Sequence, residues 1–246
     1  MQRNDLIEKS ASKYAAPVVV VPKKDKNEIR LCCDYRQVNK IIQFDPYPAS
    51  DLDDVLVRLG QAEYISTMDL TSGFWQIPLT QKAKEVSAFV VLGQHWQFKR
   101  VPFGLNISTA ACNRLMNRVL KNVTAHTISF VDDIVVYSRS FEEHLSHLRA
   151  TLECLKEANL TIKPKKCKLG ANETEILGFL VGKGKMSPNP EKIRAIEEMP
   201  RPKTKKQIRS FVGMVSFYRR FLPHAAKLTG PLTAATQRMK PDPIIW

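Results

Sequence analysis

Two adjacent acidic residues, Asp132 and Asp133, lie between two apolar segments with the composition of β-strands, residues 127–131 and 134–137. Hairpin turns usually contain Asn-Gly or Asp-Gly, and two neighbouring carboxylates repel each other. Placing such a pair beside buried strands costs free energy unless a cation neutralises the charge. Divalent metals with oxygen ligands would do this. The alternative is a solvated surface turn, and the apolar flanks argue against it.

A third acidic residue, Asp69, ends another apolar segment that predicts a strand, residues 64–68. If the three strands are neighbours in one sheet, the three carboxylates converge at one end of it. Such a set can hold two metal ions about 4 Å apart, which stabilise the attacking and leaving oxygens of a phosphoryl transfer. The sequence therefore predicts a two-metal site.

The chain has 246 residues, of which 43% are hydrophobic, which is enough for one large domain or two to three subdomains. Its 38 Lys and Arg exceed its 24 Asp and Glu, which favours a polyanionic partner, either nucleic acid or an anionic membrane face. No apolar run approaches the roughly 20 residues that span a bilayer. We therefore expect a nucleic-acid partner and no membrane.

The five cysteines form no Cys-x-x-Cys pair, so we expect no disulfide framework and a reducing, intracellular compartment. His144 and His147 lie one helical turn apart, upstream of Cys154 and Cys167, which raises the possibility of a zinc site. Their spacing matches no standard zinc finger, and a solvated helix face is the favoured interpretation.

Alternating and helical patterns predict the remaining elements. The expected segments are a hairpin of residues 18–21 and 29–33, a helix starting near Asp51, a hairpin of residues 87–92 and 95–100 with a Gly93-Gln94 turn, a helix over 107–121 with Ser108 or Thr109 as N-cap, an amphipathic helix over 141–158 with Leu145, Leu148, Leu152 and Leu155 at 3–4 spacing, and a strand over 175–181. From Ser187 onward, prolines separate short helices, and residues 203–220 predict a long basic helix in a separate helical subdomain.

Seven motifs in order resemble the reverse transcriptases of gypsy-type LTR retrotransposons and, more distantly, those of retroviruses. They are Arg30-Leu-Cys-Cys-Asp-Tyr-Arg36 with Asn39-Lys40, Met68-Asp-Leu-Thr-Ser-Gly-Phe-Trp-Gln-Ile-Pro78, Val101-Pro-Phe-Gly-Leu105, Phe130-Val-Asp-Asp133, Leu160-Thr-Ile-Lys-Pro-Lys-Lys-Cys167, Ile176-Leu-Gly-Phe179, and Arg209-Ser-Phe-Val-Gly213 with Phe217-Tyr-Arg-Arg-Phe221. Each motif alone is weak evidence, but seven in the same order are specific.

The resemblance implies an α+β right-hand polymerase fold with an antiparallel palm sheet, fingers and a helical thumb. The implied parts are fingers over 1–44 and 78–107, palm over 45–77 and 108–185 with the catalytic hairpin and primer grip, and, over 186–246, the thumb and the start of a linker toward a ribonuclease H domain. The implied activity is RNA-directed DNA polymerisation, with RNA or DNA template, primer and deoxynucleoside triphosphates as partners.

The resemblance also implies roles for individual residues. Asp69, Asp132, Asp133 and the Leu70 carbonyl would hold two Mg²⁺, or Mn²⁺ in their place, and Lys166, or Lys165 one position away, would be the general acid for pyrophosphate. The nucleotide would be bound by Lys23, Arg30, Phe74, Phe103 and Gly104, with Phe74 as the gate against a 2′-hydroxyl. The template-primer would be contacted by Leu177, Gly178, Arg209, Gly213 and Phe217. Its phosphates would be bound by Lys203, Lys205, Lys206, Arg219 and Arg220. The alternatives are exposed basic residues for Lys23 and Arg30, a core aromatic for Phe74, and a solvated basic helix for the thumb.

The sequence departs from the family pattern at two places. Residues 107–113 replace the usual Ala-Pro and Phe-Gln, and Val86 replaces a fingers lysine. A catalytically decayed nucleic-acid-binding relic therefore remains the alternative function, and a metal nuclease is a third. We expect a fragment of a Pol polyprotein, with protease, ribonuclease H and integrase elsewhere, or a truncated copy. It would act in cytoplasmic virus-like particles or the nucleus. Both a monomer and a dimer are compatible with the sequence.

Overall fold

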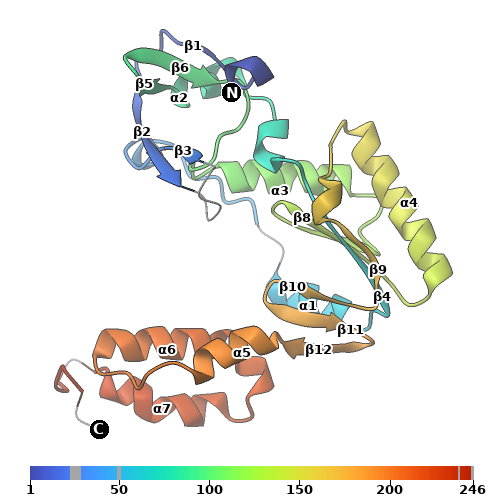
Figure 1. The fold of residues 1–246 in the computed structure, drawn as a ribbon, viewed down its shortest axis with the longest axis vertical. Helices are drawn as coiled ribbons and strands as arrows, with labels where there is room; N and C mark the ends of the chain where they lie inside the picture. The colour runs from blue at the N-terminus through green and yellow to red at the C-terminus, as the bar shows by residue number, and fades with distance from the viewer. Residues whose placement is uncertain (23–28, 49–50, 238, 245–246) are drawn as a thin grey trace.

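The computed structural model describes residues 1–22, 29–48, 51–237 and 239–244. Three sheets and a helical C-terminal part follow one another along the long axis of the molecule (Figure 1). The N-terminal sheet has the order β1-β6-β5-β2-β3, in which only the pair of β2 and β5 is parallel. Its strands are β1 (Ile7–Lys9), β2 (Ala16–Pro22), β3 (Ile29–Cys33), β5 (Phe89–Val91) and β6 (Gln94–Phe98). The predicted first hairpin is confirmed, because Val18 pairs with Cys33 and the strands run antiparallel.

The second hairpin differs in detail from the prediction. Helix α2 (Gln81–Val86), which the sequence did not indicate, precedes it, and Ser87 is the C-cap of that helix. The turn consists of Leu92 and Gly93, both with positive φ, and not of Gly93-Gln94. Two successive positive φ values suit a two-residue hairpin because they match the twist of the strands.

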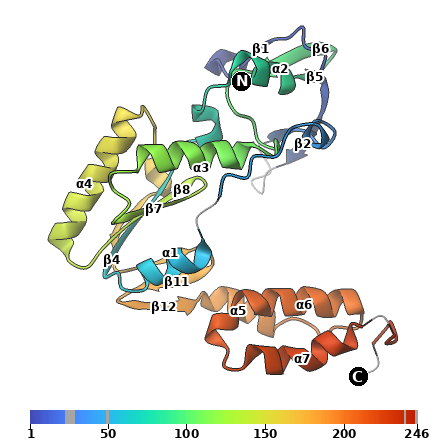
Figure 2. The same cartoon turned by 180° about the vertical axis from the view of Figure 1, so that it is seen from behind.

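The central sheet is antiparallel throughout and has the order β7-β8-β4-β9. Its strands are β4 (Tyr64–Asp69), β7 (Thr127–Phe130), β8 (Asp133–Ser138) and β9 (Lys168–Ala171). Side chains alternate between two buried faces. Ile134 and Val136 pack against helices α3 (Ser108–Val119) and α4 (Phe141–Glu157), while Val135 packs against α1 (Leu52–Leu59) and the third sheet. Figure 2 shows α3 and α4 on the side of the sheet away from α1.

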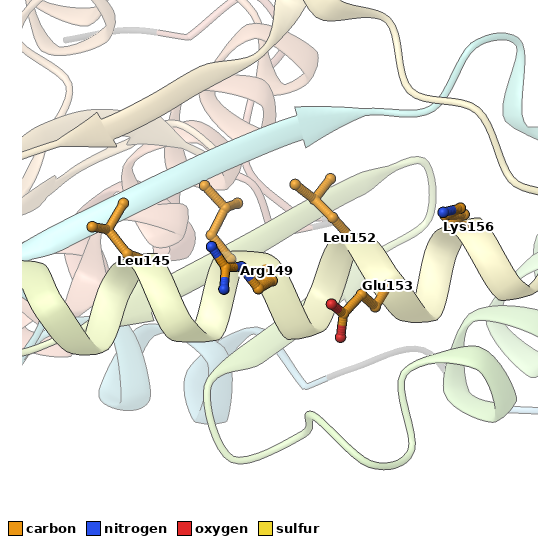
Figure 3. A pocket seen from close by; sticks show the side chains of 6 residues that line it. Leu145, Arg149, Leu152, Glu153 and Lys156 are labelled. Atoms are coloured by element: carbon orange, nitrogen blue, oxygen red, sulfur yellow. The ribbon is translucent and has the colours of Figure 1, made fainter.

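Helix α4 has the predicted length, but its leucines do not all face the core. The buried residues are His144, Thr151 and Leu155. Leu145 and Leu152 are 53% and 37% exposed, and both point into an open groove on the outer side of the helix (Figure 3). The side that faces the sheet carries the His144 imidazole and the Thr151 hydroxyl beside Leu155, so helical spacing of leucines does not by itself indicate which of them are buried.

His144 is neither on a solvated face nor a zinc ligand in this structure. It is 1% exposed, and its two ring nitrogens form hydrogen bonds with Ser66 Oγ at 2.7 Å and Ser138 Oγ at 3.0 Å. His147 Nδ1 bonds the same Ser138 hydroxyl at 2.9 Å. The favoured interpretation, a solvated helix face, is therefore wrong for His144, because buried hydroxyls on β4 and β8 provide its partners.

The predicted strand over 175–181 is a hairpin. Strands β10 (Glu173–Ile176), β11 (Phe179–Gly182) and β12 (Lys185–Pro188) form the third sheet. The turn between the first two is Leu177-Gly178, with φ of 51° and 85°. The helix over 107–121 is also corrected at its start, since Ile107 is the N-cap and Ser108 Oγ donates to the Pro102 carbonyl.

The C-terminal part is helical, as predicted. It contains α5 (Pro190–Glu197), α6 (Lys205–Phe217) and α7 (Ala225–Ala235). Helix α6 begins with a capping box, in which Thr204 and Gln207 each satisfy the other's backbone N–H. Across the described residues, no helix has the length and apolar character that crossing a membrane requires.

Candidate active site

The register of the central sheet brings two of the three predicted carboxylates face to face. β4 and β8 pair from Tyr64 opposite Ser138 to Asp69 opposite Asp133. Directly opposed residues of an antiparallel pair have Cβ atoms about 4.5–5.5 Å apart. The prediction that the three strands are neighbours is thus confirmed, and the acidic residues lie at one end of the sheet.

Asp132 lies in the two-residue turn that joins β7 and β8. Val131, its neighbour in the turn, has a φ of 57°, a region that β-branched residues rarely adopt. Two contacts hold the turn: the Leu70 N–H donates to the Asp132 carbonyl at 3.2 Å, and the Cys112 thiol donates to the Val131 carbonyl at 3.5 Å. Such strain persists only where the surroundings enforce it, and it is common at functional sites.

The carboxylate of Asp132 has an unusual environment. Its Oδ1 atom is buried and has no hydrogen-bond partner among the described residues. A Cβ added to Gly73 would lie 2.5 Å from this oxygen, so only glycine leaves room for it. A buried acceptor without a donor is costly, and a cation bound there would remove that cost.

Charge repulsion is concentrated in the same place. Burial raises the pKa of Asp132 and Asp133 above the ordinary value, and the negative charge of Asp69 raises both further. Lys166 opposes this shift, because its Nζ donates to Asp69 Oδ2 at 2.7 Å. That hydrogen bond raises the pKa of Lys166. The structure thus gives the ion pair with Asp69 to Lys166, while Lys165 lines the same pocket beside Asp69 and Asp133.

The donor set suits a divalent metal, but it is not closed into a cage. Among the residues that the structure describes, no three His, Cys, Asp or Glu side chains converge on a single ion position. The three carboxylates instead share one sheet end, with Lys166 as the nearest cation. Hard oxygen donors with excess negative charge are the ligands that Mg²⁺ and Mn²⁺ prefer.

Addition of Mg²⁺ or Mn²⁺ is therefore expected to raise the melting temperature of the chain. A ligand at 100 times its Kd stabilises the folded state by about 2.7 kcal/mol, and for this chain length 1 kcal/mol corresponds to roughly 2–4 °C. Differential scanning calorimetry at rising metal concentration measures this shift. The same titration with Asp133→Asn should show a smaller shift, and an equal shift in both proteins would place the metal elsewhere.

Three of the predicted nucleotide-binding residues, Phe74, Phe103 and Gly104, lie in the part of the chain after the first hairpin. Phe74 is buried and lies edge-to-face against Phe103, with ring centroids 5.0 Å apart. Gly104 has a φ of 98°, and the Asn39 side chain donates to its carbonyl at 2.8 Å. Asn39 lay within a quoted motif, but its role as a support of Gly104 depends on a contact 65 residues away and could not be read from the sequence.

Of the two residues predicted to bind the triphosphate, only Arg30 lies within the described residues. Lys23 lies outside the described residues. Arg30 is on β3, where it pairs with Val21 of β2. The paired strands β2 and β3 of this hairpin are present among the described residues.

Two of the predicted template-primer residues, Gly178 and Phe217, meet where the third sheet contacts α6. Phe217 is 44% exposed and stacks on Phe179 with a centroid distance of 5.1 Å. A Cβ at Gly178 would lie 3.5 Å from the Phe217 ring, whereas a Cβ at Gly213 would meet nothing within 4 Å. The hairpin turn Leu177-Gly178 and the exposed ring of Phe217 thus belong to one surface, and the Gly213 side of α6 is open.

Two basic residues of this region have partners within the chain. The Arg209 guanidinium donates to the Thr236 carbonyl at 3.0 Å. Arg220 forms an ion pair with Asp53 of α1. This contact links the helical part to the central region, so Arg220 is not the simple phosphate contact that the basic composition suggested.

The departures from the family pattern are accommodated. Cys112, at the first position of the usual Phe-Gln pair, is 1% exposed and contacts the turn between β7 and β8 through Val131. Val86 ends helix α2 and packs against the hydrophobic core of the N-terminal sheet. Neither change displaces the three acidic residues from the end of the central sheet.

Comparison with known families and proteins agrees with this geometry. The model of the family described as "Reverse transcriptase (RNA-dependent DNA polymerase)" matches residues 21–181. The chain is 35% identical over 243 residues to the retrovirus-related Pol polyprotein from transposon 297 of Drosophila melanogaster, which covers 97% of this chain and 23% of that polyprotein. It is 33% identical over 237 residues to the Pol polyprotein from transposon gypsy of the same organism, covering 94% and 23%. The chain thus spans about a quarter of these relatives.

Solved structures give the same result for the fold. The foamy viral protease-reverse transcriptase dRH in complex with double-stranded DNA matches 100% of this chain and 43% of its own, with a TM-score of 0.91 and 28% identity. The foamy viral protease-reverse transcriptase in complex with an RNA/DNA hybrid matches 100% and 33%, with a TM-score of 0.85 and 28% identity. The predicted α+β polymerase architecture is confirmed.

Proposed function

The chain belongs to the reverse transcriptase (RNA-dependent DNA polymerase) family, and from this premise we propose that it adds deoxynucleotides to a primer 3′ end on an RNA or DNA template. The observation that carries the proposal is the placement of Asp69 opposite Asp133, with Asp132 in the adjoining turn. Three carboxylates at the end of a rigid sheet can hold metal ions for phosphoryl transfer. Enzymes accelerate this reaction mainly by positioning the reacting groups and by stabilising charge in the transition state.

The residues that would hold two Mg²⁺, or Mn²⁺, are Asp69, Asp132, Asp133 and the Leu70 carbonyl. When bound, the ions lower the pKa of the primer 3′-hydroxyl and neutralise charge on the departing pyrophosphate. The unpartnered Asp132 Oδ1 and the raised pKa of the Asp132 and Asp133 carboxyls support this assignment.

Lys166 is proposed to donate the proton that pyrophosphate takes as it leaves. Its ammonium group lies beside the carboxylates and donates to Asp69 Oδ2 at 2.7 Å, which places a proton donor where the pyrophosphate would leave. Lys163, Lys165 and Lys168 lie in the same basic segment and add positive charge beside the leaving group.

Selection of the sugar is assigned to Phe74. Its ring is held by Phe103, so it cannot turn away from a 2′-hydroxyl without breaking an aromatic contact. Lys23 and Arg30 would bind the triphosphate, and Gly104 would let the backbone approach the nucleotide closely.

Template and primer are proposed to lie along the third sheet and α6. Leu177, Gly178 and Phe217 form one surface, and Gly213 opens the helix face next to it. The foamy viral enzymes that this chain resembles are described in complex with double-stranded DNA and with an RNA/DNA hybrid. A place within a longer Pol polyprotein, inside virus-like particles or the nucleus, is part of the same proposal.

The decisive experiment is primer extension on an RNA template with deoxynucleotides and Mg²⁺ or Mn²⁺. We expect incorporation directed by the template. A folded protein that binds template-primer but extends no primer would favour the decayed, nucleic-acid-binding relic. Cleavage of the nucleic acid in place of extension would favour a metal nuclease.

Template-primer affinity is expected to fall steeply with salt. The net charge is +14, and the α6 region is rich in Lys and Arg. A protein that makes 6–10 phosphate contacts loses about 10³–10⁵ in affinity between 50 and 200 mM salt. Fluorescence anisotropy with a labelled duplex measures the slope, and a flat response would contradict binding through this basic surface.

A further inference from the structure

Two loops meet beside Asp69. The first follows β4 and contains the short helix Gly73–Gln76 with Phe74, and the second leads from Thr161 toward Lys166. Three backbone contacts join them: Leu70 bridges Ile162, the Thr71 N–H donates to the Thr161 carbonyl at 2.9 Å, and the Lys163 N–H donates to the Asp69 carbonyl at 2.8 Å. Without contacts of this kind, each loop would be free to shift relative to the other.

The Gln76 side chain closes this junction. Its amide nitrogen donates to the Thr71 and Thr161 carbonyls, both at 2.9 Å. Its amide oxygen accepts from the Thr161 N–H at 2.8 Å and from the Thr161 hydroxyl at 3.3 Å. A glutamine amide has two donors and an oxygen with two lone pairs, so all its hydrogen-bonding capacity is used.

The chemistry of this network requires an amide. The nitrogen faces two carbonyls and the oxygen faces two donors, which fixes the orientation of the group. A carboxylate of the same shape would place an acceptor against two carbonyl oxygens, and an apolar side chain would remove all four hydrogen bonds that join Gln76 to Thr71 and Thr161. The backbone carbonyl of Gln76 is held as well, because Arg100 Nη1 donates to it at 3.1 Å.

We propose that Gln76 is a positioning residue that fixes the distance between the sugar gate and the general acid. Gln76 is two residues from Phe74 in one short helix, and Thr161 begins the loop that carries Lys166 to Asp69. One side chain therefore links the group that selects the sugar to the group that protonates pyrophosphate. The inference rests on the proposed polymerase function and adds a coupling between two of its parts.

This coupling predicts that Gln76→Ala affects both the selection of the sugar by Phe74 and the rate of the step that depends on Lys166. The preference for deoxynucleotides over ribonucleotides, measured as the ratio of kcat/KM values, should fall about tenfold, because misplacement of a group by about 1 Å can cost up to 10²-fold in rate. The kcat for extension with deoxynucleotides should fall as well, because Lys166 is displaced from Asp69. In the double variant with Lys166→Ala, the two losses in kcat should not multiply, since both act through the same lysine.

Two variants keep the test interpretable. Gln76→Glu retains the shape of the side chain and should lose discrimination at least as strongly as Gln76→Ala. Gln61→Ala removes another glutamine whose oxygen accepts from Arg139 at 2.7 Å, near the end of the β4–β8 pair opposite the carboxylates. Gln61→Ala should leave the sugar ratio unchanged. A normal sugar ratio and a normal kcat in Gln76→Ala would overturn the proposal.

A measurement without catalysis separates this proposal from the polymerase function itself. Hydrogen exchange should show faster exchange of the Thr161 amide in Gln76→Ala, and amine labelling of Lys166 should become faster as its ion pair loosens. These changes are expected even if the wild-type chain extends no primer, which would count only against the proposed function. Unchanged exchange and unchanged Lys166 labelling would overturn the coupling regardless of activity.

Discussion

Asp132→Asn is expected to lower the rate of primer extension by about 10³-fold, the upper end of the range for loss of one charge-stabilising group. The metal-free protein should become more stable. The substitution removes the negative charge of the residue whose Oδ1 has no partner among the described residues. The change in shape is minimal, so the loss in rate reports the loss of a metal ligand. Single-turnover extension on an RNA template measures it.

The stability effect has the opposite sign for a physical reason. Burial and the charge of Asp69 raise the folded-state pKa of Asp132 above the ordinary 3.8. A raised pKa contributes stability that is complete below pH 3.8 and is lost as the pH rises through the folded-state value. At neutral pH the wild-type chain therefore carries an unfavourable charge, which the asparagine removes.

Calorimetry at neutral pH without metal should show a higher melting temperature for Asp132→Asn, and addition of Mg²⁺ should reduce the difference. Asp54→Asn is a suitable control, because Asp54 is exposed and lies 4.0 Å from Arg58 on α1, away from the carboxylates. Asp54→Asn should change neither extension nor the response to Mg²⁺. If Asp132→Asn destabilised the metal-free chain, the repulsion inferred at the site would be wrong.

Gly73→Ala is expected to reduce primer extension by about 10²-fold, the loss that a misplacement of about 1 Å produces, with little loss of stability. The added Cβ would lie 2.5 Å from Asp132 Oδ1 and 3.1 Å from its Cγ. The end of a flexible side chain can rotate away, so the fold survives. The carboxylate then leaves the position that it holds beside Asp69 and Asp133.

Gly230→Ala is the matched control for this change. A Cβ at Gly230 meets nothing within 4 Å, and the residue lies inside α7, where alanine favours the helix by about 1 kcal/mol. Extension by Gly230→Ala should equal that of the wild type. Full activity in Gly73→Ala, with Mn²⁺ affinity unchanged by calorimetric titration, would show that the side-chain orientation of Asp132 is not fixed by Gly73.

Local patterns predicted the elements whose signals are local. The apolar runs around Asp132 and Asp133, the acidic start of α1 at Asp51 and the strand that ends at Asp69 all appear as expected. Turn chemistry was less clear. Leu92 and Leu177 adopt positive φ, which their residue type does not suggest, so one hairpin turn was shifted and one hairpin was expected as a single strand.

Burial could not be read from periodicity in α4. Leu145, Leu148, Leu152 and Leu155 follow helical spacing, yet Leu155 alone of the four is buried, while His144 and Thr151 face the sheet. The reason is that hydroxyl groups on β4, β7 and β8 satisfy the polar atoms of this helix face. These partners lie on three different strands, 6 to 78 residues away, and helical spacing does not indicate them.

The sequence alone determined which residues could carry the chemistry: adjacent acids between apolar strands, a third acid at a strand end, and ordered motifs that identified the family. Only the tertiary structure decided which groups touch. The β4–β8 register placed Asp69 opposite Asp133, Lys166 and not Lys165 reached Asp69, and Gln76 bound Thr161. The physical reason is that carboxylate repulsion and hydrogen bonds act over a few ångströms, while these partners are separated by 64 to 97 residues along the chain.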